Sequence, residues 1–248
     1  MLNNNLIYAN FCWKIVRTTE TGGVRILYNG AAREGKCYYA SGSDAEIGES
    51  PFNKPADHKK YTGYMYGDDD NPYQNINDSE VKKYIDNWYK LNIKDKGFEG
   101  ALDKDAIYCG NRTETPDRLD IRYSQQAKEG LLSMNCPLND SYGVTSGNKK
   151  LKYPVALLSL DEAMMAGAGW MNDMNMDYYI YNGNAFWLLS PSLGSEYNDY
   201  YITSVEYRGS LNHNRAYLDE GVRPVVTLSA YSFLKDGNGS AEKPYLIQ

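Results

Sequence analysis

Two stretches near the N-terminus carry the apolar and aromatic residues that are typical of β-strands. The first covers residues 6–17 and the second covers residues 24–28, and the polar segment between them contains Gly22 and Gly23. Two such runs joined by a glycine-containing turn predict a β-hairpin. Residues 29–75 are rich in Gly, Ser, Pro, Asp and Lys, so we expect loops with short strands there.

The clearest helical pattern begins near Asp78 and Ser79, because either side chain can accept hydrogen bonds from the exposed backbone amides at a helix start. Apolar residues then recur at helical spacing, at Val81, Tyr84, Ile85 and Trp88. This stripe is typical of a helix that packs one face against a core, and it assigns Trp88 to packing.

A second helix is predicted to begin at Ser159, because Glu162 three residues later completes the pattern of a capping box. We expect this helix to stop at Gly167. Residues 153–158, just before it, predict a buried strand. From residue 169 onward, short aromatic runs alternate with polar turns, which predicts short strands over residues 178–181, 185–189, 201–207, 215–218 and 222–228.

These elements predict a single α+β domain over residues 1–248, with two main helices and short antiparallel strands. Residues 1–150 form its loop-rich part, which bears all the cysteines, and residues 151–248 form its strand-rich part, which displays the ligand-binding surface. No linker rich in Pro or Ser separates the two parts, so we expect them to share one fold.

The aromatic composition favours a binding function. The chain has 24 Tyr but only 5 Phe, and residues 177–223 are loaded with Tyr, Asn, Ser and Gly. Recognition surfaces use these residues because tyrosine offers a large rigid contact area and the small polar residues adapt their hydrogen bonds.

Charge and hydropathy narrow the range of partners. The net charge of −6 is dispersed and no cluster of Lys and Arg occurs, so we expect no nucleic-acid partner. No stretch approaches the ~18 apolar residues of a membrane span, so we expect no direct membrane insertion. The first five residues lack the basic and apolar regions of a secretion signal.

The four cysteines, Cys12, Cys37, Cys109 and Cys136, leave two interpretations open. They are either buried free thiols or disulfides, and four cysteines allow three pairings. We favour two local bridges, Cys12 with Cys37 and Cys109 with Cys136, which indicate an extracellular compartment. No CxxC spacing occurs, and His58 and His213 are the only histidines, so no zinc ligand set is evident.

Motifs for catalysis are weak. No Gly-x-Ser-x-Gly segment accompanies His213, which we interpret as a surface residue. Residues 67–72 contain three consecutive aspartates that suggest either a calcium site or, as we favour, a solvated turn. Residues 236–240 predict a tight turn before a last strand. We therefore predict no catalytic residue, no metal and no cofactor, and expect the protein not to be an enzyme.

Several motifs resemble a family of surface-associated domains of unknown function from Gram-positive gut bacteria. The motifs are Phe-Trp-Leu-Leu-Ser-Pro at residues 186–191 and Gly-Val-Arg-Pro at residues 221–224, together with the segments at residues 10–23, 85–89 and 236–245. The similarity extends over nearly the whole chain. Members of that family carry cysteines near the four cysteines of this chain, which supports the two bridges.

The tail with these two motifs is also similar to the closing strands of the C-type lectin-like fold, as in formylglycine-generating-enzyme-like domains and in the variable proteins of diversity-generating retroelements. This resemblance implies a C-type lectin-like fold. No cysteine follows Cys136, so it implies no formylglycine-generating activity. In the variable proteins, mutagenesis at adenines leaves Asn, Tyr, Ser, Asp and His at displayed sites. The same composition also occurs without diversification, so both origins stay open.

We therefore expect an extracellular adhesion or recognition module on a cell surface, as part of a larger anchored protein. Its partner is expected to be a protein or glycan ligand on another cell or on a phage. The candidate ligand-binding residues are Tyr178, Tyr179, Tyr181, Tyr197, Asn198, Asp199, Tyr200, Tyr201, Tyr207, Asn212, His213, Asn214 and Tyr217. The alternatives are a cell-wall or glycan hydrolase with a carboxylate pair, which requires facing carboxylates and a raised pKa on one of them, and a structural spacer module.

Overall fold

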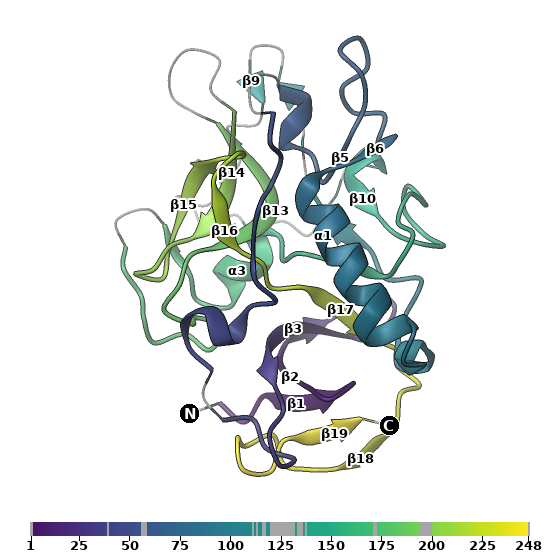
Figure 1. Cartoon of the computed structure of the whole chain (residues 1–248), viewed down its shortest axis with the longest axis vertical. Coiled ribbons are helices and arrows are strands. Elements are labelled where there is room, and N and C mark those ends of the chain that lie inside the picture. Colours follow the sequence, from purple (N-terminus) through teal and green to yellow (C-terminus); the bar gives the residue numbers. More distant parts are fainter. Residues whose placement is uncertain are drawn as a thin grey trace.

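Two β-sheets contain most of the strands in the part of the chain that the structure describes (Figure 1). The computed structural model describes residues 2–38, 40–55, 59–110, 112, 114–115, 118–119, 132, 136, 138–170, 173–193 and 200–247. The seven-stranded sheet lies mainly in the lower half of Figure 1, the six-stranded sheet lies at the upper left, and the long helix lies at the right. The fold is β-rich and sandwich-like.

The seven-stranded sheet joins both ends of the chain. Its strands, in spatial order, are β11 (Val155–Ala156), β17 (Val225–Leu228), β3 (Val24–Ala31), β2 (Phe11–Thr18), β1 (Asn5–Tyr8), β19 (Tyr245–Ile247) and β18 (Leu234–Asp236). β1 and β19 pair in parallel, and Leu6 lies opposite Tyr245. Strands from the two ends of the sequence therefore lie side by side in this sheet.

The six-stranded sheet comes mostly from the C-terminal part of the chain. Its strands, in spatial order, are β12 (Gly169–Trp170), β15 (Ser210–Arg215), β14 (Tyr200–Val205), β13 (Phe186–Leu193), β16 (Asp219–Gly221) and β4 (Glu49–Pro51). Three further pairs are β5 (Met65–Tyr66) with β6 (Asn77–Asp78), β7 (Tyr108–Cys109) with β10 (Ser141–Tyr142), and β8 (Glu114–Thr115) with β9 (Arg118–Leu119).

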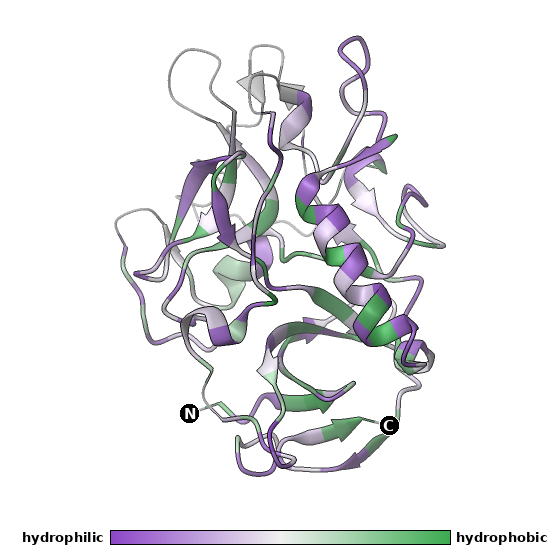
Figure 2. Ribbon diagram, viewed as in Figure 1, coloured by the Kyte–Doolittle hydropathy of each residue, from purple (hydrophilic) through white to green (hydrophobic). Residues whose placement is uncertain are grey.

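The long helix begins where the sequence predicts. α1 (Glu80–Tyr89) continues into a π-helical turn, η3 (Lys90–Lys94), and its N-cap is Ser79, whose Oγ accepts from the backbone N–H of Lys82. Val81 and Ile85 are fully buried, and Figure 2 shows hydrophobic and hydrophilic residues alternating along the helix. The shorter α3 (Leu160–Met165) has the predicted capping box between Ser159 and Glu162. In the part of the chain that the structure describes, the other helical turns are η1 (Gly42–Ala45), η2 (Lys59–Thr62), η4 (Phe98–Ala101) and η5 (Leu138–Asp140).

The expected fold class, an α+β, C-type lectin-like fold with two main helices and short antiparallel strands, is wrong. Within the described residues, the protein is mostly β-sheet and has one long helix. α3 has only six residues, and the backbone turns at Gly167, where φ is +115°. The capping box starts α3 as predicted. Gly167 ends the helix within two turns, because the chain leaves the helical conformation at that glycine, so α3 is too short to be a second main helix.

The predicted N-terminal hairpin is confirmed by the antiparallel pairing of β2 with β3. The first run, however, is two strands, because Ala9 and Asn10 both have positive φ values and turn β1 back onto β2. The interior behind these strands is aromatic. The Trp88 ring packs against Phe11, Trp13 and Tyr28 with ring centroids 5.4 to 6.3 Å apart, so its assignment to packing is confirmed.

Trp187 and Arg223 belong to the scaffold. Trp187 is buried, and its indole N–H donates to the carbonyl of Ser50. Arg223 is buried too, and its guanidinium donates to the carbonyls of Tyr28 and Ile180 and to the side chain of Asn29. These bonds connect the segment just before β17 to β3 and to the turn that contains Ile180.

Both expected disulfides are present, and no described cysteine is free. Cys12 pairs with Cys37, and Cys109 pairs with Cys136. Within the described residues, no helix has the length and apolar character needed to cross a membrane.

Candidate functional site on the C-terminal sheet

The antiparallel hairpin of β14 and β15 carries the centre of the predicted ligand-binding region. Ser204 lies opposite Asn212, and Thr203 lies opposite His213. Because successive side chains of a strand point to opposite faces, Asn212 and Asn214 share one face with Ser204, and Tyr201 and His213 lie on the other. The structure therefore divides the predicted residues between two faces of one sheet.

The face with Asn212 and Asn214 holds a hydrogen-bonded cluster of amides and carboxylates. The Nδ2 atom of Asn214 lies 2.7 Å from Glu220 Oε1 and 3.1 Å from Glu206 Oε1. It also lies 3.2 Å from the Oγ atom of Ser204, and Asn212 Nδ2 lies 3.2 Å from Glu206 Oε1. Glu206 directly follows β14 and Glu220 lies on β16. The Asn214 side chain therefore links two carboxylates from different parts of the sheet.

Burial perturbs the ionisation of this cluster. The pKa of Glu220 is raised to about 7, first because the carboxyl is largely removed from water and then because the negative charge of Glu206 is near. The hydrogen bond from Asn214 acts in the opposite direction. A carboxyl group with this pKa exchanges its proton near neutral pH.

A third carboxylate, Glu46, lies behind the cluster. Asn182 and Asn184 donate to its oxygens at 3.0 and 3.1 Å, and burial raises the pKa of Glu46 despite these bonds. A side-chain carbon at position 221 would collide with the Glu46 carboxylate, so this close approach requires glycine there. The glycine of the Gly-Val-Arg-Pro segment thus leaves room for the Glu46 carboxylate.

The opposite face of the hairpin pairs an aromatic ring with the imidazole. The rings of Tyr201 and His213 meet edge to face, with centroids 4.9 Å apart. Burial lowers the pKa of His213, with the charge of Glu206 acting in the opposite direction. The imidazole is accordingly neutral at pH 7.

The tyrosines of the predicted region differ in their exposure. Tyr178 is only 8% exposed and belongs to the hydrophobic core, and Tyr179 packs against that core while donating to the carbonyl of Val16. The hydroxyl of Tyr181 donates to the carbonyl of Tyr207 at 2.7 Å. These three residues connect the hairpin to the scaffold.

Two tyrosines of the region are displayed. Tyr207 is 56% exposed at the turn between β14 and β15, and Tyr217 is 45% exposed beyond the other end of β15. The Arg208 guanidinium lies over the Tyr207 ring, 5.2 Å from its centroid, and Arg215 donates to the Tyr217 hydroxyl at 3.1 Å. Each exposed ring is thus accompanied by an arginine.

The side chains of four predicted residues lie outside what the structure describes. Tyr197, Asn198 and Asp199 lie outside the described residues, as does His58. Tyr200 begins β14, but its side chain is not among those described. The site is therefore built from the other members of the predicted set.

Sequence reasoning missed the carboxylates Glu46, Glu206 and Glu220. A usable signal exists for Glu206, because it is two residues after Ser204 at the end of β14, just as Asn214 is two residues after Asn212 on β15. No local pattern places Glu46 or Glu220 beside them. Among the described residues, no group of three or more His, Cys, Asp or Glu side chains is arranged to hold a metal ion.

Comparison with known proteins finds one match. The family DUF6273, described as a domain of unknown function, matches residues 66–230. No curated protein and no solved structure matches the chain. The matched region includes α1, the whole β14–β15 hairpin and the three strands that surround it in the sheet, β12, β13 and β16.

Proposed function

Since the chain belongs to the DUF6273 family of domains of unknown function, we propose from its site alone that it is an extracellular binding module. Its binding surface is the β14–β15 hairpin, and its ligand is a protein or glycan. The single observation that carries the proposal is the display of Tyr207 and Tyr217 at the two ends of β15, with half-buried amides and carboxylates on the hairpin between them. Exposed aromatic rings supply contact area, and the amides supply adaptable hydrogen bonds.

An extracellular location is compatible with the two disulfides, which persist in oxidising compartments. A larger anchored protein on the cell surface is part of the proposal. So is diversification of the hairpin by a retroelement. Sequencing of the adjacent DNA tests the diversification. Diversification requires a reverse transcriptase gene and a near-identical template copy of the segment that encodes the hairpin.

The binding proposal predicts that removing the displayed rings weakens binding. In a screen against bacterial, phage and host surface proteins and a glycan panel, the double variant Tyr207→Ala/Tyr217→Ala should bind its best ligand at least about tenfold more weakly than the parent. Burial of aromatic side chains commonly supplies this much binding free energy at interfaces. Surface plasmon resonance provides the measurement.

Tyr231→Ala is the matched control, because Tyr231 is an 88% exposed tyrosine outside the hairpin. It should leave binding unchanged. Equal affinity of the double variant and the parent for every detected ligand would exclude the hairpin as the binding surface.

A second candidate function, hydrolysis of a glycan or cell-wall substrate, is favoured by one observation. Glu220, with its pKa raised to about 7, lies beside Glu206 across the amide of Asn214. A carboxyl that keeps its proton near neutral pH next to a second carboxyl is the acid–base arrangement of many glycosidases.

The hydrolase predicts that Glu220→Gln lowers cleavage of peptidoglycan or of a soluble oligosaccharide at least about a hundredfold, since it removes a general acid. Glu49→Gln is the control, because Glu49 acts on Glu220 only through its charge. Product release is followed by chromatography. An inert parent protein, or equal rates for the parent and Glu220→Gln, would eliminate this candidate.

A further inference from the structure

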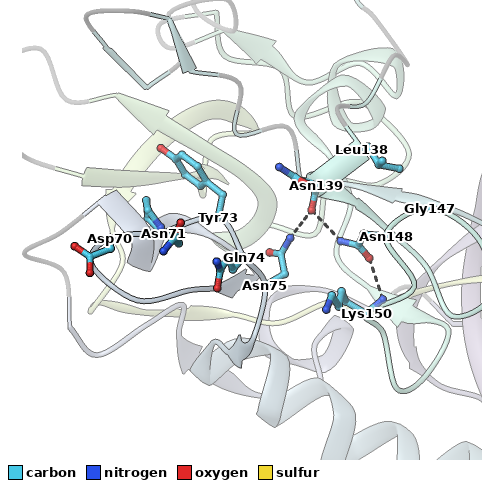
Figure 3. A pocket seen from close by; sticks show the side chains of 11 residues that line it. Asp70, Asn71, Tyr73, Gln74, Asn75, Leu138, Asn139, Gly147, Asn148 and Lys150 are labelled. Carbon is cyan, nitrogen blue, oxygen red and sulfur yellow. Dashed lines mark hydrogen bonds between the residues drawn. The ribbon is translucent and has the colours of Figure 1, made fainter.

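A separate pocket of about 720 Å³ opens between the loop that joins β5 to β6 and the segment around β10 (Figure 3). Residues 70–75 form one wall, and residues 138–139 and 147–150 contribute the other. Pockets that enclose small molecules commonly have volumes of roughly 300 to 1,000 Å³. β5, β6 and β10 lie to the right of the β14–β15 hairpin in Figure 1, so the pocket is distinct from the hairpin surface.

Asn75, which lines this pocket, belongs to a buried polar network around Arg112. The Arg112 guanidinium bonds the carboxylate of Asp140 at 2.6 and 2.8 Å and donates to the Asn75 Oδ1 atom at 2.6 Å. The Tyr142 hydroxyl lies 3.1 Å from the same Asn75 oxygen. All four side chains are buried. A bonded network of this kind fixes the Asn75 side chain in one conformation at the pocket.

One backbone carbonyl joins the walls of the pocket. The oxygen of Asn139 accepts from Asn75 Nδ2 at 2.5 Å and from Asn148 Nδ2 at 2.9 Å, as Figure 3 shows. The side-chain oxygen of Asn148 in turn accepts from the backbone N–H of Lys150 at 3.0 Å. The two walls are therefore held together by Asn75, Asn148 and the Asn139 backbone. The other polar side chains that line the pocket, called the rim below, take no part in these bonds.

The polar side chains of the rim are free to bind a ligand. Within the described part of the chain, five polar side chains that line the pocket have no hydrogen-bond or ion-pair partner, and all five residues are exposed. They are Asp70, Asn71, Gln74, Asn139 and Lys150. A pocket whose walls are held in place, with polar groups free to bond a ligand, is the arrangement of a binding site.

The chemistry of the rim indicates an uncharged ligand rich in hydroxyl groups. One carboxylate and one ammonium balance in charge, and three amides each offer both donors and an acceptor. The Tyr73 ring also lines the pocket, and the Arg112 guanidinium lies 5.1 Å from its centroid, which holds the ring in place. We infer that this pocket is a second binding site, which takes a neutral saccharide.

The inference predicts that removing two amides of the rim weakens binding of a neutral sugar. A glycan array that carries neutral and sialylated oligosaccharides identifies the best neutral sugar, and calorimetry measures its affinity. Gln74→Ala/Asn139→Ala should bind that sugar at least about tenfold more weakly than the parent, because two side-chain hydrogen bonds are lost. The melting temperature should be unchanged, since neither side chain has a partner in the described structure.

Asn3→Ala is the control, because Asn3 has an exposed amide without a described partner and lies outside the pocket. It should bind the sugar like the parent. The hairpin variant Tyr207→Ala/Tyr217→Ala should also bind like the parent, which separates this site from the proposed hairpin surface.

Affinity should be the same at 50 mM and 500 mM salt, because a neutral ligand makes no ion pair that salt screens. Three results would overturn the inference. They are the absence of any neutral sugar bound by the parent, equal affinity of the parent and the rim variant, and binding that is lost at high salt.

Discussion

At the scale of single residues, Glu220 makes stability depend on pH. Its pKa is raised from 4.5 to about 7, so ionisation of this carboxyl is less favourable in the folded than in the unfolded chain. Below about pH 4.5 the group is protonated in both states and has no effect. Between about pH 4.5 and 7 the unfolded chain releases the proton first, so the free energy of unfolding falls as pH rises.

Glu220→Gln should therefore raise the free energy of unfolding at pH 8 by about 1 kcal/mol and leave it nearly unchanged at pH 4.5. This magnitude is discounted for the partial exposure of the group. Urea unfolding at both pH values provides the measurement. Because the pKa of Glu46 is also raised, the variant should keep part of the pH dependence. An identical pH dependence in the parent and the variant would contradict the assignment.

At the scale of an element, the start of α1 depends on one hydroxyl. Ser79 is fully buried, and its Oγ atom accepts from the Lys82 N–H at 3.2 Å. Ser79→Ala should lower the free energy of unfolding by about 1 kcal/mol or more, because the amide loses its partner in a buried setting. Ser41→Ala is a matched control, since Ser41 precedes η1 but makes no capping bond. Equal losses in the two variants, measured by urea unfolding, would refute the capping role.

At the scale of the whole molecule, the disulfides close loops of similar length. The bridged cysteines are 25 residues apart in the first loop and 27 in the second. In the chain-entropy account, each bridge lowers the entropy of the unfolded chain enough to add about 3 kcal/mol of stability. Reduction with dithiothreitol should therefore lower the urea midpoint. Cys12→Ala/Cys37→Ala and Cys109→Ala/Cys136→Ala should each lower it by a similar amount. A reduced protein with the midpoint of the oxidised protein would contradict this account.

Local patterns predicted the elements whose signals lie within a few residues. The hairpin of β2 and β3, the N-cap of α1, the capping box of α3 and the final strand all occur where the sequence places them. The end of α3 at Gly167 was predicted correctly as well, whereas the number of main helices and the fold class were predicted wrongly. Capping residues mark where a helix begins, whereas its length depends on how far packing and Gly167 let it continue.

For the site, the sequence indicated the region and the tertiary structure selected its members. Composition pointed to the C-terminal tyrosines and asparagines, but exposure separates Tyr207 and Tyr217 from the buried Tyr178. The pocket went unpredicted, because Asn75 and Asn139 are 64 residues apart in the sequence and meet only in the folded chain, where the Asn75 amide donates to the Asn139 carbonyl.

The sequence by itself determined the local elements, the disulfide-bearing cysteines and the polar aromatic character of the C-terminal region. Only the tertiary structure decided that β1 pairs with β19, and that Asn214 lies between Glu206 and Glu220. The physical reason is that a capping bond or a tight turn is formed by residues adjacent in the chain. Strand pairing and a carboxylate cluster join residues whose sequence separation carries no signal of their contact.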